Sequence, residues 1–116
     1  MSTVAVTYFD RDGVRRAVDE YVRGLAARHP ELEEVVLFGS LASGTPVPGS
    51  DVDLLLVLGA SDRSFRDRIP LFLPTGLPVG VDVFPYTRAE IEGMRSEGNS
   101  FVARALREGL TIFRRT

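Results

Sequence analysis

The chain has 116 residues, an apolar fraction of 44%, a net charge of −2 and no cysteine. This length suffices for one domain with a hydrophobic core but not for a catalytic domain plus a second lobe, so we expect residues 1–116 to form a single domain. The lack of cysteine excludes disulfides and thiolate metal sites. No apolar run approaches the roughly 18 residues of a membrane span, and no signal-peptide pattern is present, which predicts a cytoplasmic protein.

All fourteen basic residues are arginine. The absence of lysine excludes a P-loop, whose lysine reaches the phosphates, and also excludes Schiff-base chemistry. The acidic net charge and the lack of a basic block remove the electrostatic footprint of a general nucleic-acid binder. A small ligand or a protein is therefore the expected partner.

The N-terminal part predicts one long helix. Residues 1–9 alternate weakly between apolar and polar, which is consistent with a strand or an extended arm. Asp10 or Asp12 can cap a helix, and the apolar residues of Val14–Leu25 then recur at the spacing of one helical face. Pro30 ends this helix.

Four short strands are predicted after the helix. The first covers Val35–Phe38, and residues 39–50 follow as a loop rich in Gly, Ser, Thr and Pro. Val52–Leu58 is an apolar run too short for a buried helix, so it predicts a strand. Val79–Phe84 and Thr111–Phe113 are the third and the closing strand.

Helices are predicted between the later strands. Ser61 can cap a short helix that Pro70 must end or kink. Thr87 and Glu90 form the pattern of a capping box, and Asn99 can cap one more helix. The inward positions of that last helix are predicted to be Phe101, Val102, Ala105 and Leu106. The alternation of strands and helices predicts an α/β fold, with a small sheet and helices packed mainly on one side.

Three aspartates lie in or beside the predicted strands. Residues two apart in a strand share a face, so Asp51 and Asp53 point the same way. Asp82 lies in the third strand, and all three acids converge if the two strands are neighbours. Unpaired carboxylates among apolar residues are costly, and a divalent cation such as Mg²⁺ or Mn²⁺ would offset that cost. The alternative is structural: Asp51 caps the strand, and Asp53 and Asp82 pair with arginines.

Gly39 and Ser40 follow the first predicted strand directly. A helical turn over residues 40–43 would direct backbone N–H groups and a positive dipole end towards an anion. Gly39 has no Cβ and lets the backbone approach a phosphate closely. Together with the acids, this turn indicates a nucleotide–metal site of the kind that performs phosphoryl or nucleotidyl transfer.

These residues resemble a known family. The elements are Gly39-Ser40, a spacer of ten residues, Asp51-Val52-Asp53, and Asp82 within an apolar strand. The pattern is similar to that of the minimal nucleotidyltransferases, the small bacterial and archaeal members of the polymerase-β-like nucleotidyltransferase superfamily. The resemblance covers nearly the whole chain, including the ending Ala105–Phe113. It implies a mixed sheet with flanking helices, ATP as nucleotide donor, and two magnesium ions.

The resemblance also implies a role for each motif residue. Asp51 and Asp53 would hold both metal ions. Asp82 would hold the ion nearer the acceptor hydroxyl and help to deprotonate that hydroxyl. Gly39 and Ser40 would bind the β- and γ-phosphates of ATP.

One pair of positions departs from the family pattern. Basic residues often follow the serine directly and two positions later, where this chain has Leu41 and Ser43. The phosphate charge would then fall on magnesium, on backbone N–H groups and on an arginine elsewhere. Arg63, Arg66 and Arg68 are candidates, although an arginine-rich helix face is more commonly only solvated.

The leading prediction is an enzyme that transfers AMP from Mg·ATP to an acceptor hydroxyl and releases pyrophosphate. Many members of the family resemble antitoxins paired with an adjacent HEPN-domain toxin, and some attach AMP to that toxin, which implies a HEPN-type protein partner. Two alternatives stay open: a non-catalytic module that neutralises a partner by direct contact, and a small-molecule enzyme of the aminoglycoside type. The sequence leaves the acceptor and any homo-oligomer undetermined.

Overall fold

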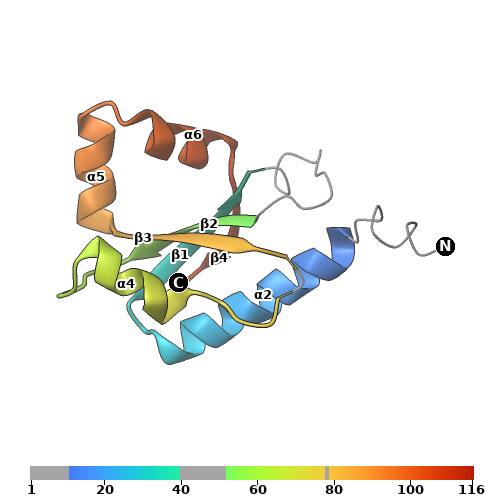
Figure 1. The fold of residues 1–116 in the computed structure, drawn as a ribbon. Helices are drawn as coiled ribbons and strands as arrows, with labels where there is room; N and C mark the ends of the chain where they lie inside the picture. Colours follow the sequence, from blue (N-terminus) through green and yellow to red (C-terminus); the bar gives the residue numbers. More distant parts are fainter. Residues whose placement is uncertain (1–10, 40–51, 78) are drawn as a thin grey trace.

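The computed structural model describes residues 11–39, 52–77 and 79–116 (Figure 1). The segment 1–9, the loop residues 40–50 and Asp51 lie outside the described residues. The elements in chain order are α2 (Arg11–Arg28), β1 (Leu32–Phe38), β2 (Val52–Leu58), α4 (Phe65–Phe72), β3 (Val81–Thr87), α5 (Arg88–Ser96), α6 (Ser100–Glu108) and β4 (Leu110–Arg114). In the part of the chain that is described, none of the helices has the length and apolar character needed to span a bilayer.

The four strands form one sheet in the order β3-β2-β1-β4. Strand β1 runs antiparallel to both β2 and β4, whereas β2 and β3 are parallel. A parallel pair needs a crossover connection, which is supplied here by the segment that contains α4. The predicted α/β class with a mixed sheet is therefore confirmed.

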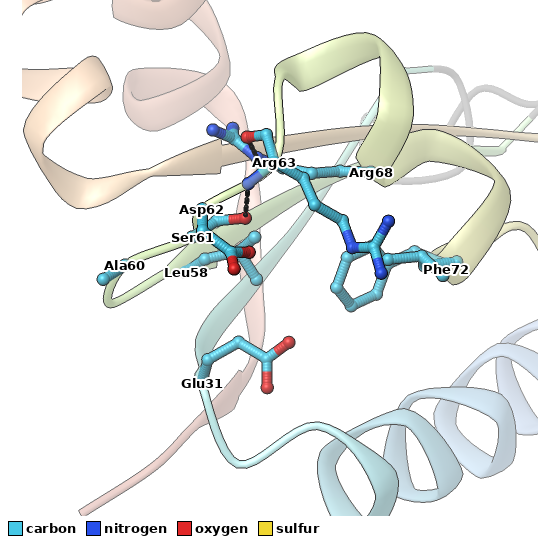
Figure 2. A pocket seen from close by; sticks show the side chains of 9 residues that line it. Glu31, Leu58, Ala60, Ser61, Asp62, Arg63, Arg68 and Phe72 are labelled. Carbon is cyan, nitrogen blue, oxygen red and sulfur yellow. Dashed lines mark hydrogen bonds between the residues drawn. The ribbon is translucent and has the colours of Figure 1, made fainter.

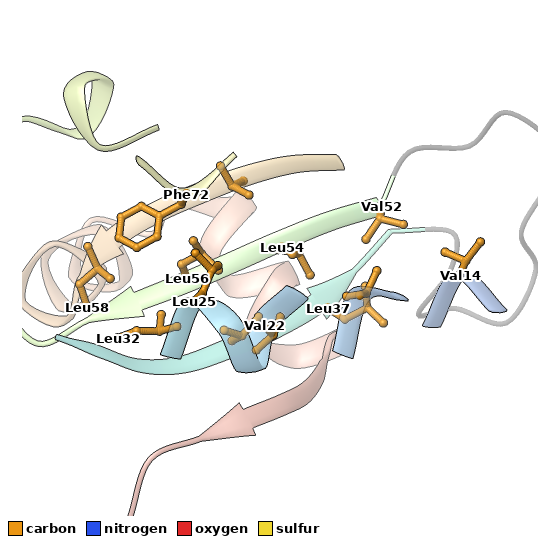
Figure 3. Close-up of a cluster of buried hydrophobic side chains, with 13 residues drawn as sticks. Val14, Val22, Leu25, Leu32, Leu37, Val52, Leu54, Leu56, Leu58 and Phe72 are labelled. Atoms are coloured by element: carbon orange, nitrogen blue, oxygen red, sulfur yellow. The ribbon is translucent and has the colours of Figure 1, made fainter. Parts of the chain in front are cut away.

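Strand β2 is buried on both of its faces. Leu54, Leu56 and Leu58 pack in a cluster with apolar residues of α2 such as Val22 and Leu25 (Figure 3). The residues that alternate with them, including Leu55 and Val57, pack in a second cluster with α5 and α6. The helices thus cover both faces of the sheet (Figure 1). The prediction that they pack mainly on one side is therefore wrong. A strand that is apolar at successive positions requires cover on both sides, since successive side chains point to opposite faces.

The predicted helix caps of the C-terminal half are confirmed. Thr87 accepts a hydrogen bond from the backbone of Glu90, whose carboxylate accepts one from the backbone of Thr87. Asn99 accepts a hydrogen bond from the backbone N–H of Val102 at the start of α6. Leu106 was predicted to face the core, but 37% of this residue is exposed.

Strand β4 is one residue longer at each end than predicted, and two strands differ by more than that. Strand β1 begins at Leu32 and includes Glu33 and Glu34, whose carboxylates pair with arginines at the sheet surface. The start of this strand was not predicted because the two charged glutamates interrupt its apolar pattern. Strand β3 runs over Val81–Thr87, later than the predicted Val79–Phe84, because Pro85 and Thr87 continue the register with β2.

The start of α4 also differs from the prediction. Ser64 caps the helix by accepting a hydrogen bond from the backbone of Asp67, whereas Ser61 accepts from Arg63 in the preceding turn. Pro70 lies inside the helix, which continues to Phe72.

Candidate functional site

Two of the three predicted acids lie side by side in the sheet. Asp53 of β2 is the register partner of Asp82 of β3, and Phe38 of β1 is the partner of Asp53 on the other side. Neighbouring strands are about 4.8 Å apart, and paired residues of a parallel ladder point to the same face. The strand register therefore brings the two carboxylates together in one row across the sheet.

The two carboxylates differ in burial. Asp53 is half-buried, whereas Asp82 is exposed because it is the second residue of the edge strand β3. The burial penalty expected for Asp82 from its apolar neighbours in sequence is therefore wrong. Among the described residues, no ion pair joins Asp82 to an arginine, so the structural alternative finds no support for this acid.

The third predicted acid, Asp51, lies outside the described residues, and its place in the site stays a prediction. Within the described ranges, no three His, Cys, Asp or Glu side chains gather as a metal-binding group. A metal site at Asp53 and Asp82 would therefore require at least one further ligand.

Gly39 lies directly against the carboxylate of Asp53. Its φ of 89° is in the left-handed region, which favours glycine. A Cβ at this position would come within 2.5 Å of Oδ2 of Asp53. The sequence predicts that Gly39 lets a phosphate approach the backbone; in the structure, the missing side chain also makes room for the carboxylate of Asp53. Ser40 lies outside the described residues, so its role in phosphate binding stays a prediction.

Three phenylalanines form a cluster beside the acid row. The rings of Phe38 and Phe101 are 5.5 Å apart, those of Phe84 and Phe101 are 5.0 Å apart, and those of Phe38 and Phe84 are 5.8 Å apart. Phe84 lies two residues after Asp82 and so shares its face. From the sequence, only Phe101 was expected to face inward from the last helix. The signal for the other two is their position along the chain, because Phe38 directly precedes Gly39 and Phe84 follows Asp82 by two residues.

The arginines proposed for the phosphates lie at the opposite end of the sheet. Helix α4 begins after the C-terminal end of β2, and Leu58 at that end is about 16 Å along the strand from Asp53. Arg63 and Arg68 line an open pocket of about 550 Å³ there. Figure 2 shows them together with Leu58 and Glu31, which line the same pocket. The prediction that Arg63, Arg66 or Arg68 serves the acid site is wrong on this ground.

Arg68 has a different role. Only 3% of this residue is exposed, and its guanidinium donates to both carboxylate oxygens of Glu90 at 2.7 and 3.0 Å. It also donates to the backbone carbonyls of Pro85 and Arg63, each at 3.0 Å. The hydrogen bonds from Arg68 hold the pKa of Glu90 below its usual range. Arg68 therefore joins α4, β3 and α5.

Comparison with known proteins agrees with this geometry. A family model described as a nucleotidyltransferase domain matches residues 18–106, a range that contains Gly39, Asp53 and Asp82. Among solved structures, the chain is similar to a protein from Sulfolobus solfataricus assigned as a nucleotidyltransferase. The two are 25% identical with a TM-score of 0.61, over 90% of this chain and 86% of that one. Among curated proteins, none matches this sequence.

Proposed function

The chain belongs to the nucleotidyltransferase domain family, and from this membership we propose that it transfers AMP from Mg·ATP to a hydroxyl group of a partner protein. The observation that carries the proposal is the row formed by Asp53 and Asp82, with Gly39 packed against it. Nucleotidyl transfer is the general activity of the family; ATP, magnesium and the protein acceptor are the proposed details.

The donor set suits a hard divalent cation. Asp53 and Asp82 offer only carboxylate oxygen atoms, the ligands that Mg²⁺ prefers, and they are register partners on neighbouring strands. Asp51 would complete the set. When bound, Mg²⁺ would neutralise phosphate charge and align the attacking and leaving oxygens.

Gly39 and Ser40 would hold the β- and γ-phosphates with backbone N–H groups and the serine hydroxyl. The acceptor oxygen then forms a bond to the α-phosphorus, while the bond to the bridging oxygen of pyrophosphate breaks. The proton of the acceptor hydroxyl passes to the carboxylate of Asp82. The exposure of Asp82 supports this assignment, because an acceptor that arrives from solution can reach it.

A protein is the acceptor that fits this chain best. The acidic net charge does not favour a nucleic acid, and the exposure of Asp82 suits a hydroxyl group that a docked protein presents. The resemblance to antitoxins points to a HEPN-type toxin as the partner.

The test is incubation with the product of the neighbouring gene and ATP labelled at either the α- or the γ-phosphate. We expect label on the partner from the α-position only, and its loss in Asp82→Asn. Transfer of the γ-label would indicate kinase chemistry instead. A tight complex without any label would favour the non-catalytic binding module, and label on an added aminoglycoside would favour the small-molecule enzyme.

A further inference from the structure

We propose that the phenylalanine cluster of Phe38, Phe84 and Phe101 is the surface on which the nucleotide base stacks. This inference rests on the proposed function, since it assigns the base end of the same site. The motif residues account for the metal and the phosphates, but they leave the base without a binding surface.

The position of the cluster is the first support. Phe38 is the register partner of Asp53, and Phe84 lies two residues after Asp82 on the same face of β3. Two residues of a strand span about 6.6 Å, so the cluster borders the acids on the side towards α6. Gly39 continues from Phe38 at the strand end. A nucleotide held by its phosphates between the acids and Gly39 would have its base within reach of the rings.

The second support is the partial exposure of the rings. Leu55 and Val102, which belong to the same apolar cluster, are each 0% exposed. Phe38, Phe84 and Phe101, by contrast, each keep part of their surface accessible to solvent. The cluster is thus the part of this apolar layer that a ligand can contact.

The third support is that the backbone of Phe101 is held in place before any ligand binds. It is the second residue of α6, whose first turn is closed by the hydrogen bond from Val102 to the side chain of Asn99. The backbone N–H of Asn99 in turn donates to the carbonyl of Met94 at 2.9 Å. A surface fixed in this way lowers the entropy cost of binding.

The chemistry of the cluster defines its preference. Aromatic side chains stack on the π-face of every base, and phenylalanine has no hydrogen-bonding group that could distinguish base edges. Stacking gains from a larger ring system, so the cluster should favour purine over pyrimidine nucleotides.

Calorimetry of Phe101→Leu with two probes, Mg·ATP and Mg·tripolyphosphate, tests the inference. Leucine keeps the apolar side chain but removes the π-face. We expect about a tenfold loss of ATP affinity, about 1.4 kcal/mol, with the affinity for tripolyphosphate unchanged. Phe101→Tyr should retain ATP binding because its ring still stacks. The matched control is Phe65→Leu, since Phe65 stacks on Tyr86 at the far end of the sheet and should affect neither probe.

An equal loss for both probes would show that Phe101 supports the acids and not the base, and would overturn the inference. Unchanged binding of both probes by Phe101→Leu would also overturn it. If Asp53→Asn leaves the binding of both probes as in the wild type, the proposed function itself fails. That result concerns the variant Asp53→Asn, so it can be told apart from the two results with Phe101→Leu that would overturn the stacking surface.

Discussion

The two ends of the sheet use their charged residues in opposite ways. At the end where β2 and β3 begin, two carboxylates stand next to each other, and Asp82 is exposed. At the end where β3 finishes, the charges of Arg68 and Glu90 satisfy each other within the fold. Both ends have charges, but the carboxylates of the first end lie side by side, whereas Arg68 and Glu90 at the other end are paired with each other.

The difference shows why an arginine near a motif in the sequence is weak evidence for phosphate binding. Arg68 follows Asp53 by fifteen positions, yet its guanidinium is occupied by one carboxylate and two backbone carbonyls. A buried guanidinium needs such partners, because a buried charge without them is costly. Its role is therefore decided by the helix and strand ends that surround it.

The largest expected effect is on catalysis at the acid end. Asp82→Asn should reduce AMP transfer by about a thousandfold or more, since the loss of a metal ligand and proton acceptor removes several kcal/mol of transition-state stabilisation. Its free energy of unfolding should change by less than about 0.5 kcal/mol, because the side chain is exposed. Transfer assays and denaturant titrations would measure these two quantities.

Two further variants serve this prediction. Asp62→Asn, an exposed aspartate near α4, is the control and should transfer AMP normally. Asp53→Asn should lose the rise in Tm that Mg²⁺ gives to the wild type. Equal thermal shifts in the wild type and in Asp53→Asn would contradict the metal site.

The next effect is on stability at the arginine end. Arg68→Met should lower the free energy of unfolding by about 2–4 kcal/mol, because Glu90 and the carbonyl of Pro85 lose their buried donor. The rise in Tm on addition of Mg²⁺ should remain. Arg66→Met, an exposed position on the same helix, is the control and should stay close to the wild type. Loss of the Mg²⁺ response in Arg68→Met would mean that the two ends are coupled.

A smaller effect is expected at Gly39. Gly39→Ala and Gly76→Ala should each lose about 1–2 kcal/mol of stability, since both glycines have a positive φ, 89° and 77°. A Cβ at Gly76 meets nothing within 4 Å, whereas one at Gly39 meets the carboxylate of Asp53. Only Gly39→Ala should therefore weaken Mg²⁺ binding in a titration. An equal Mg²⁺ affinity in the two variants would rule out the contact as a determinant of the site.

The smallest effect is a pH dependence from Glu90. The pKa of Glu90 in the folded state lies below its ordinary value of 4.5, mainly because of the hydrogen bonds from Arg68. Its stabilising contribution is therefore complete above pH 4.5 and is lost as the pH falls through the folded-state pKa. Glu90→Gln should show a shallower loss of Tm between neutral and acid pH, while Glu92→Gln on the exposed part of the same helix should follow the wild type. Identical acid profiles for all three proteins would exclude this linkage.

Local physics made several features predictable from the sequence. The capping box of Thr87 and Glu90 and the cap at Asn99 depend on residues three positions apart, so their pattern is complete within one helical turn. The run Val52–Leu58 could only be a strand, and the spacing of Gly39, Asp53 and Asp82 identified the family. These inferences needed no knowledge of how distant segments meet.

Tertiary structure decided the remaining features, because each depends on a partner far away in the sequence. The register of β2 against β3 places Asp53 beside Asp82, and the turn at Gly39 is packed against the same carboxylate. The helices cover both faces of the sheet because β2 is buried on both of its sides. The apolar run of β2 alone does not show which helices pack on which face. Arg68 could be assigned only once Glu90, 22 positions later, was seen to lie against it. The role of a charged side chain depends on the groups that surround it in space. The sequence by itself determined only the contacts between residues that are close together along the chain.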